Sequence, residues 1–248
     1  MSGVALITGS GRGIGAATAK LAAKRGYAVC VNYLKNEARA DEVVAEIRSG
    51  GGKAILVQAD TANEFEVEKM FERVDLELGP LTALVNNAGI TGRFGRLESF
   101  DAAAIRRVLE VNVTGTILCS QQAVKRMSTR NGGAGGAIVN LSSLAATLGG
   151  ANQWLPYAAA KGAINSFTLG LAREVAAEGI RVNAVSPGLI ETEIHAEAGA
   201  GDRLQKMAPM VPMQRLGTAE ECAQAILWLM SDEAAYMIGG ILPVSGGR

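Results

Sequence analysis

Short apolar runs alternate with longer segments of helical periodicity along most of the 248-residue chain. Seven runs rich in β-branched residues predict strands, at Val4–Thr8, Ala28–Tyr33, Ala54–Gln58, Ala83–Asn86, Ala137–Leu141, Arg181–Val185 and Ile241–Val244. The segments between them predict helices, at Ile14–Lys24, Ala38–Ser49, Glu64–Leu78, Phe100–Arg130, Pro156–Glu178 and Ala219–Ser231. Because the strands are apolar throughout, we expect a parallel sheet buried under helices on both faces. The pattern therefore predicts an α/β fold with a doubly wound parallel sheet of about seven strands.

The composition is that of a globular protein, with 48% hydrophobic residues. Lysine and arginine together number 24, as do aspartate and glutamate, so no net charge attracts nucleic acid or an anionic membrane. We find no linker or repeat and expect a single domain over residues 1–248. Residues 189–217 follow a predicted strand and have weak periodicity, which predicts a substrate lid. His195 lies in this segment, where we expect a solvated or packing role, and no residues have metal-ligand spacing, so no metal is expected.

Cysteine usage and the apolar runs bear on the compartment. Cys30, Cys119 and Cys222 lie far apart without C-x-x-C spacing, which is typical of buried thiols in a reducing compartment. The chain enters a predicted strand without a basic leader, and no apolar run approaches the ~20 residues of a membrane span. We therefore expect a cytoplasmic protein with no membrane partner.

A glycine-rich turn joins the first predicted strand to the first predicted helix and reads TGSGRGIG over residues 8–15. Glycines let the backbone turn sharply and approach a pyrophosphate, whose charge then faces the N-terminus of the helix. A tight turn alone would also need glycines, but the strand before it and the helix after it are the context of a dinucleotide-binding turn. The fold class is therefore refined to a Rossmann-type sheet.

Tyr157 and Lys161 lie four residues apart at the start of a predicted helix, so their side chains share one face, one turn apart. A tyrosine with its ordinary pKa of ~10 is a poor base at neutral pH. A neighbouring ammonium group and an oxidised nicotinamide would both favour the phenolate, so we expect the pKa of Tyr157 to be lowered. The phenol could then give or take a proton at a reacting oxygen atom.

The order of these motifs resembles the short-chain dehydrogenase/reductase family, and the resemblance covers essentially the whole chain. It rests on TGxxxGIG at residues 8–15, NNAG at residues 86–89, the Y-x-x-x-K of Tyr157 and Lys161, and N-x-V-x-P-G at residues 183–188. The resemblance implies a single-domain NAD(P)-dependent oxidoreductase that moves hydride between nicotinamide and a carbonyl or alcohol, with Tyr157 as general acid/base. It also implies a homotetramer and a small-molecule substrate.

The resemblance further implies a catalytic set, which is Asn112, Ser143, Tyr157 and Lys161. Ser143 would polarise the substrate carbonyl, and Ser142 is an alternative that aligns less well with the preceding strand. The gap from Ser143 to Tyr157 is one residue longer than in many members, and residues 151–156 would absorb the insertion. Asn112 would distort the fourth helix and hold a water toward Lys161, or else simply bond across a helix interface.

The cofactor is expected to be NADP, with NAD as the alternative. The second predicted strand ends without the acid that NAD-binding proteins usually offer to the ribose, and Arg12 and Lys35 could converge on a 2′-phosphate. Asp60 would receive the adenine amino group, or it caps the next helix. The implied cofactor contacts are Gly9, Arg12, Gly13, Ile14, Gly15, Tyr33, Lys35, Asp60, Thr61, Asn87, Ala88, Gly89, Tyr157, Lys161, Pro187, Gly188, Ile190 and Thr192.

The substrate stays open between several classes. The chain resembles 3-oxoacyl-carrier-protein reductases at residues 171–174 and 231–234, and it also resembles glucose-type sugar dehydrogenases. An acidic carrier protein needs basic residues beside the cleft, but Glu178 stands where such reductases often have arginine, and only Arg126 and Arg130 could compensate. We therefore expect a general carbonyl or sugar-type reductase ahead of a fatty-acid enzyme. A non-catalytic NADP-binding sensor is a further alternative, which the retention of the whole catalytic set disfavours.

Overall fold

Seven parallel strands form one sheet in the computed structural model, which describes residues 3–192 and 205–248. The strands are β1 (Gly3–Ile7), β2 (Tyr27–Tyr33), β3 (Ala54–Gln58), β4 (Ala83–Asn86), β5 (Gly136–Leu141), β6 (Ile180–Pro187) and β7 (Ile241–Val244). Their order is β3-β2-β1-β4-β5-β6-β7, and every neighbouring pair is parallel. The strand order reverses between β1 and β4, and ligands of such sheets bind at that point, beyond the carboxyl ends of the strands. The predicted fold class is confirmed.

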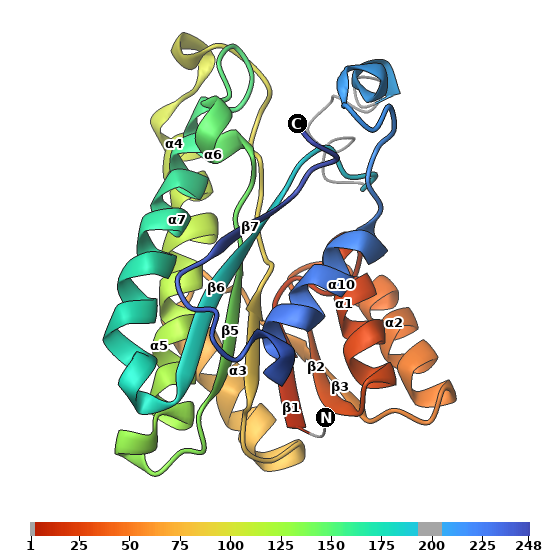
Figure 1. Cartoon of the computed structure of the whole chain (residues 1–248), viewed down its shortest axis with the longest axis vertical. Coiled ribbons are helices and arrows are strands. Elements are labelled where there is room, and N and C mark those ends of the chain that lie inside the picture. Colours follow the sequence, from red (N-terminus) through yellow and green to blue (C-terminus); the bar gives the residue numbers. More distant parts are fainter. Residues whose placement is uncertain (1–2, 193–204) are drawn as a thin grey trace.

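Helices cover both faces of the sheet (Figure 1). One face carries α1 (Gly13–Lys24), α2 (Glu37–Ser49) and α10 (Ala219–Met230). The other face carries α3 (Glu64–Glu77), α4 (Ala102–Leu109), α5 (Gly115–Met127) and α7 (Leu155–Val175). A short helix, α6 (Ala145–Leu148), follows β5 at the carboxyl edge of the sheet. No described helix has the length and apolar character needed to cross a membrane.

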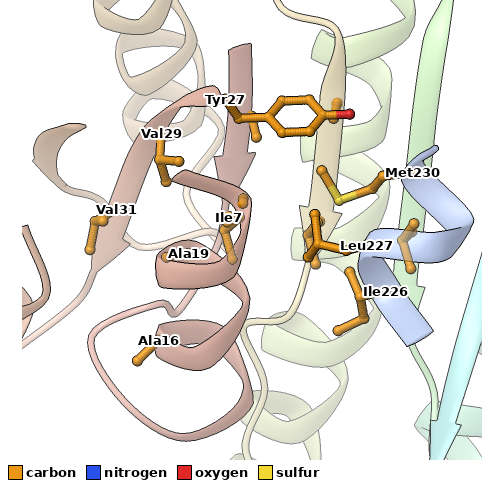
Figure 2. Packing of buried hydrophobic residues seen from close by; sticks show 14 of the residues in the cluster. Ile7, Ala16, Ala19, Tyr27, Val29, Val31, Ile226, Leu227 and Met230 are labelled. Atoms are coloured by element: carbon orange, nitrogen blue, oxygen red, sulfur yellow. The ribbon is translucent and has the colours of Figure 1, made fainter. Parts of the chain in front are cut away.

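Each face of the sheet buries its own apolar cluster. On the first face, Ala16 and Ala19 of α1, Ile7 of β1, and Ile226 and Leu227 of α10 belong to one buried cluster (Figure 2). The small alanine side chains let the two helices approach closely, so the larger side chains of α10 fill the space over the sheet. Full burial of a side chain such as leucine contributes about 1.5–3 kcal/mol. The second cluster joins α3, α5 and α7 to the opposite face.

The structure corrects one predicted helix. Residues 100–130 form α4, a π-helical turn at Glu110–Thr114, α5 and a 3-10 turn at Thr129–Asn131, rather than a single helix. A π turn inserts one residue into an otherwise continuous helix, and the apolar periodicity of the sequence does not register so small a change. Such turns are frequent at functional sites, and this one contains Asn112.

The predicted lid lies only partly within the described residues. Residues 193–204, which include His195, lie outside them. At the two ends of the segment, the amide of Gly217 donates to the Leu189 carbonyl at 2.9 Å and the amide of Glu191 donates to the Gly217 carbonyl at 2.9 Å. These bonds hold the two ends side by side, and the lid function itself stays a prediction.

Candidate active site

The glycine-rich turn follows β1 and leads into α1. Gly9 and Gly13 have φ angles of +62° and +52°, a left-handed conformation that glycine adopts without strain. The residue at the N-cap of α1, Arg12, provides no side-chain cap, and the first turn of α1 holds no acid. The first amides of α1 therefore point out of the helix end without a capping side chain, an arrangement that suits a pyrophosphate.

The NNAG segment after β4 braces this turn from one side. The amide Nδ2 of Asn87 donates to the carbonyl oxygens of Thr8 and Gly9, at 2.9 Å each. The Thr8 hydroxyl accepts hydrogen bonds from the backbone amides of Asn87 and Ala88, at 3.0 Å each. A Cβ at Gly15 would lie only 2.5 Å from Nδ2 of Asn87, so this position requires glycine. The glycine turn and the NNAG segment, both predicted to contact the cofactor, are thus packed and hydrogen-bonded to each other.

Asn32, in β2, braces the same turn from the other side. Its buried Oδ1 accepts from the Gly9 amide at 3.0 Å, and its Nδ2 donates to the carbonyls of Val57 at 3.3 Å and Ala59 at 3.1 Å. Its backbone carbonyl accepts from the Ser10 amide at 2.8 Å. The sequence analysis missed this role. An asparagine inside an apolar predicted strand was the signal that could have revealed it, because a buried side-chain amide needs several hydrogen-bond partners.

The tip of β2 carries both signs of charge. Arg12 and Lys35 are both exposed. They follow closely in sequence after Gly9 and Asn32, the two residues that join the glycine turn to β2. Tyr33 is buried, and its burial and the neighbouring carboxylate of Glu37, with which it hydrogen-bonds, raise the pKa of its phenol. The strand itself ends without an acid, as predicted, but Glu37 reaches its tip from the first turn of α2.

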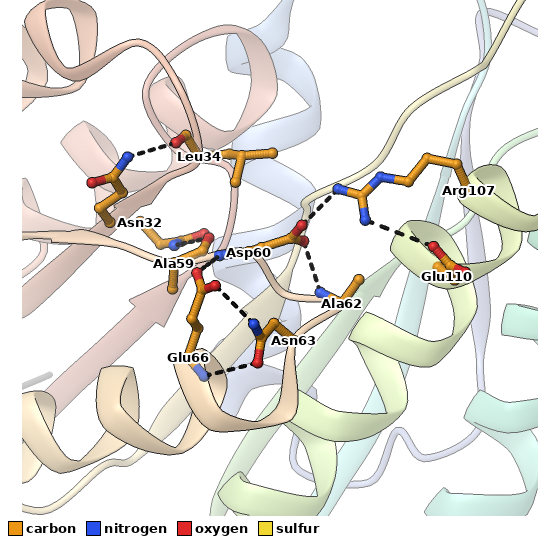
Figure 3. A network of polar contacts seen from close by, with 10 residues as sticks. Asn32, Leu34, Ala59, Asp60, Ala62, Asn63, Glu66, Arg107 and Glu110 are labelled. Atoms are coloured by element: carbon orange, nitrogen blue, oxygen red, sulfur yellow. Dashed lines mark hydrogen bonds and ion pairs between the residues drawn. The ribbon is translucent and has the colours of Figure 1, made fainter. Parts of the chain in front are cut away.

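Asp60 follows β3 and joins a polar network with α3 and α4 (Figure 3). Its Oδ1 accepts from the Ala62 amide at 2.9 Å, and its Oδ2 accepts from Nη2 of Arg107 at 2.7 Å. The N-cap of α3 is Asn63, whose side chain accepts from the first amides of that helix. The alternative in which Asp60 caps the helix is therefore wrong.

Tyr157, Ser143 and Lys161 meet on one wall of a cavity at the carboxyl edge of the sheet. Tyr157 and Lys161 lie in the first turns of α7, and Ser143 lies two residues beyond β5. The Nζ of Lys161 lies 5.6 Å from the centre of the Tyr157 ring, and the Tyr157 hydroxyl hydrogen-bonds with Ser143. The structure thus brings together three of the four predicted catalytic residues. The fourth, Asn112, comes from an earlier part of the sequence.

Burial governs the pKa of both ionisable groups in this cluster. It raises the pKa of Tyr157, and the hydrogen bond with Ser143 opposes this shift without overcoming it. The expectation of a lowered pKa is therefore wrong for the chain alone, because desolvation disfavours the phenolate. Burial also lowers the pKa of Lys161 to about 8, and its Nζ donates to the Leu141 carbonyl at 2.5 Å.

Asn112 lies beside Lys161, close to Gly89. A Cβ at Gly89 would lie 2.7 Å from Oδ1 of Asn112 and 3.7 Å from Nζ of Lys161. The Nδ2 of Asn112 donates to the carbonyls of Ile90 and Val108 at 2.8 Å each, whereas its buried Oδ1 has no hydrogen-bond partner among the described residues. An unsatisfied buried acceptor costs about 1–3 kcal/mol, so a water or ligand donor at this point would be stabilising.

The two candidate serines differ in what they contact. The Oγ of Ser142 is buried and donates to Oδ1 of Asn165 at 2.5 Å. The Oγ of Ser143 accepts from the Ala145 amide at 3.1 Å and lies beside Tyr157. The geometry favours Ser143 as the serine that acts with Tyr157.

The cavity has a volume of about 360 Å³. The predicted site residues that line it are Ile14, Asn87, Gly89, Asn112, Ser143, Tyr157, Lys161, Pro187, Gly188, Ile190 and Thr192. The other predicted cofactor residues lie outside its lining, at the glycine turn, at the tip of β2, after β3 and, for Ala88, after β4. An anion-binding helix end, left-handed glycines and an unpartnered amide oxygen beside Lys161 fit a nicotinamide dinucleotide laid along this edge.

Known proteins resemble the chain over nearly its whole length. Residues 9–248 match the family model described as Enoyl-(Acyl carrier protein) reductase. The chain is 52% identical to the uncharacterized oxidoreductase YgfF of Escherichia coli (strain K12), over 99% of each chain. It is 42% identical to the cis-4-hydroxycyclohexanecarboxylate dehydrogenase of Sinomonas cyclohexanicum, over 98% of this chain and 95% of that protein. A solved variant of a Serratia marcescens short-chain dehydrogenase/reductase matches it with a TM-score of 0.90 and 31% identity, covering 99% of this chain and 97% of that one.

The match of the family model, the relatives and the fold agree with the glycine turn and the arrangement of Tyr157, Ser143 and Lys161. The chain is an oxidoreductase that belongs to the short-chain dehydrogenase/reductase family, whose members use NAD(P).

Proposed function

We propose that this protein is an NADP-dependent oxidoreductase that transfers hydride between nicotinamide and a carbonyl or alcohol, with Tyr157 as general acid/base. The observation that carries the proposal is the cluster of Tyr157, Ser143 and Lys161 on a cavity wall that continues toward the glycine turn. A proton donor, a second hydroxyl and a cation are the groups that a carbonyl oxygen needs while it gains negative charge.

The chain's own residues would handle the proton. When bound, the reduced nicotinamide supplies the hydride to the carbonyl carbon. The raised pKa keeps Tyr157 protonated at neutral pH, so its O–H is available to the carbonyl oxygen, while Ser143 holds the same oxygen. Lys161, with its pKa of about 8, is mostly protonated at pH 7 and stabilises the phenolate that remains. Asn112 would hold a water toward Lys161, which its unpartnered Oδ1 supports.

The cofactor would lie with its pyrophosphate at the glycine turn and its adenine near Asp60. The segment that would hold the nicotinamide carboxamide lies close to this turn, because a Cβ at Gly13 would be 3.6 Å from Cγ2 of Thr192. Lys161 and Thr192 line the same cavity. With the carboxamide at Thr192, Lys161 would contact the nicotinamide ribose.

NADP preference would depend on the charges at the tip of β2. Lys35→Ala is expected to lower the affinity for NADPH relative to NADH by about 10-fold, because one charge-assisted phosphate contact is lost. Glu37→Gln is expected to move the ratio in the opposite direction, since it removes a negative charge beside Tyr33. Fluorescence titration with both cofactors measures the ratio, and tighter binding of NADH by the unaltered protein would overturn the preference.

The lining of the cavity supports an apolar carbonyl substrate of moderate size. Beyond the catalytic group, its wall includes Leu144, Leu148, Trp154, Leu189 and Met207, and the described lining contains no acidic residue. Outside the predicted site residues, the polar side chains of the lining are Thr91, Ser142, Gln153 and Arg248, fewer than the apolar ones. We therefore rank sugars below apolar carbonyl compounds. The relative named for cis-4-hydroxycyclohexanecarboxylate would act on a ring of this size, so we place cyclic ketones and alcohols first.

A dedicated 3-oxoacyl-carrier-protein reductase has weaker support. Glu178 forms an ion pair with Arg130 at 2.9 Å, and Arg126 pairs with Asp75 at 2.7 Å. Both arginines that could have formed a basic docking surface are thus neutralised by neighbouring acids, which leaves an acidic carrier protein little net attraction there.

The test is NADPH consumption with a panel of cyclic ketones, aldehydes, sugars and a β-ketoacyl thioester. We expect turnover of the cyclic ketones and little of the sugars. Selective turnover of the thioester would instead favour the fatty-acid reaction. A protein that binds NADPH but reduces no member of the panel would favour the non-catalytic sensor.

A homotetramer is supported by apolar surface in two places. Leu109 of α4 and Ile117 of α5 are exposed, as are Tyr236 and Ile238 before the edge strand β7. Exposed apolar patches and unpaired strand edges are usually covered by partners. Light scattering should give four times the chain mass, and a monomer mass would contradict this.

The three free, buried cysteines suit a reducing cytoplasm, which fractionation of the native cells would check.

A further inference from the structure

The loop after β3 is attached to both ends of the π turn that carries Asn112. Before the turn, Arg107 in the last turn of α4 donates through Nη2 to Oδ2 of Asp60 at 2.7 Å (Figure 3). After the turn, Gly115 packs directly on Thr61, since a Cβ there would lie 2.8 Å from the Thr61 Oγ1 and 3.0 Å from its carbonyl oxygen. Because Asp60 and Thr61 are adjacent, one short loop holds both ends of the turn.

The Asp60 carboxylate is itself held in place. Its Oδ1 accepts from the Ala62 amide at 2.9 Å, and its backbone amide donates to Oε2 of Glu66 at 2.7 Å. Arg107 also lies 3.8 Å from Oε2 of Glu110, the first residue of the π turn. The guanidinium therefore bridges a fixed loop and the start of the turn, as Figure 3 shows.

The register of the π turn decides where Asn112 points. A shift of one residue in a helix rotates a side chain by about 100°. Such a shift would move Oδ1 of Asn112 away from its place next to Gly89 and Lys161. An ordinary α-helical register needs one residue fewer in this segment, so contacts that hold both ends of the segment favour the π turn over that register.

We propose that Arg107 is a positioning residue, which fixes the register of the π turn against Asp60 and so keeps Asn112 beside Lys161. The expected effect of Arg107 on turnover rests on the proposed function, in which Asn112 acts with Lys161. The position of the π turn can be measured without turnover.

Arg107→Met removes the bridge with little loss of side-chain length, and Arg126→Met is the matched control. Arg126 also makes a 2.7 Å ion pair with an aspartate of another helix, but it lies in the last turn of α5, away from the π turn. With saturating NADPH and the ketone reduced fastest in the panel, Arg107→Met should lower kcat about 10- to 100-fold, as expected for a small displacement in a catalytic site. Arg107→Lys should recover part of this loss, and Arg126→Met should leave kcat unchanged.

A double-mutant cycle separates positioning from a general loss of structure. If Arg107 acts through Asn112, then Arg107→Met should lower kcat no further in a chain that already carries Asn112→Ala. The same fold loss in both backgrounds would overturn the proposal, and so would an equal loss in Arg126→Met.

Hydrogen–deuterium exchange gives a readout that does not depend on activity. The peptide spanning residues 108–116 should exchange faster in Arg107→Met than in the unaltered protein, and at the unaltered rate in Arg126→Met. Unchanged exchange in Arg107→Met would overturn the positioning role. Absence of turnover with every ketone would count against the proposed function alone, since the exchange result would still stand.

Discussion

The two halves of the sheet hold their functional groups in different ways. Beside β1 to β3, the groups that we propose face the cofactor are backbone amides of the glycine turn, and a buried side chain, Asn32, holds this turn. Beside β4 to β6, the groups are side chains such as Tyr157 and Lys161, and helix α7 fixes them. Substitutions in the first half should therefore change cofactor affinity, while substitutions in the second half should change turnover.

A chain of buried polar side chains distinguishes the second half further. The Nδ2 of Asn86 donates to Oδ1 of Asn140 at 2.8 Å and to Oγ of Ser120 at 3.0 Å. The Nδ2 of Asn140 donates to Oγ1 of Thr168 at 2.9 Å. These bonds tie β4 and β5 to α5 and α7. Helix α7, which carries Tyr157 and Lys161, and helix α5, which follows the π turn with Asn112, therefore cannot rotate freely over the sheet.

The largest expected effect is that of Tyr157→Phe, which removes the proton donor and leaves the glycine turn intact. We expect kcat to fall by about 10²- to 10⁴-fold, the usual contribution of a general acid, with the Kd of NADPH little changed. Tyr236→Phe is the control, because it keeps the aromatic ring of the proposed subunit contact and removes a hydroxyl that lies outside the cavity lining. An active Tyr157→Phe protein would erase the distinction between the two halves.

Asn32→Ala tests the first half and should have a smaller effect. The substitution leaves the Gly9 amide and the carbonyls of Val57 and Ala59 without this partner, at a cost of about 1–3 kcal/mol for each buried group that stays unsatisfied. We expect the Kd of NADPH and of NADH to rise together by about 10-fold, with kcat at saturating cofactor nearly unchanged. A change in the ratio of the two Kd values, as expected for Lys35→Ala, would show that Asn32 contacts the ribose instead.

The smallest effect is expected at the opposite edge of the sheet, where Glu178 joins the segments that precede β5 and β6. The Ser128 hydroxyl, at 2.5 Å, and Arg130, at 2.9 Å, lower the pKa of Glu178 from its ordinary value of 4.5. The stability that this shift provides is present above pH 4.5 and is lost as the pH falls through the lowered pKa. Thermal unfolding should therefore show a lower Tm for Glu178→Gln at pH 7, and a smaller difference below pH 4.5. A difference independent of pH, or a loss of turnover, would contradict this account.

The sequence predicted the fold and the glycine turn between β1 and α1 because both depend on local pattern. Apolar runs identify buried strands, and a glycine turn between a strand and a helix determines its own geometry. The Tyr157 and Lys161 pair was also predictable, since a spacing of four on a helix brings two side chains together.

Other features depended on contacts between distant segments and escaped prediction. The extra residue in the π turn leaves the periodicity of residues 100–130 almost unchanged. The pKa of Tyr157 depends on its desolvation in the folded chain, which no short motif specifies. The partner of Asp60 proved to be Arg107, 47 residues away, a pairing that local spacing does not reveal.

Deuterium transfer tests the central claim most directly. The protein is incubated with the ketone reduced fastest in the panel and with NADPH that carries deuterium at C4 of the nicotinamide, in each of its two epimeric forms. Mass spectrometry of the alcohol should find deuterium on the carbinol carbon with one epimer only, and the rate at which this deuterated alcohol forms should fall by at least about 100-fold in Tyr157→Phe. Alcohol formed without deuterium from either epimer, or undiminished transfer in Tyr157→Phe, would contradict the account.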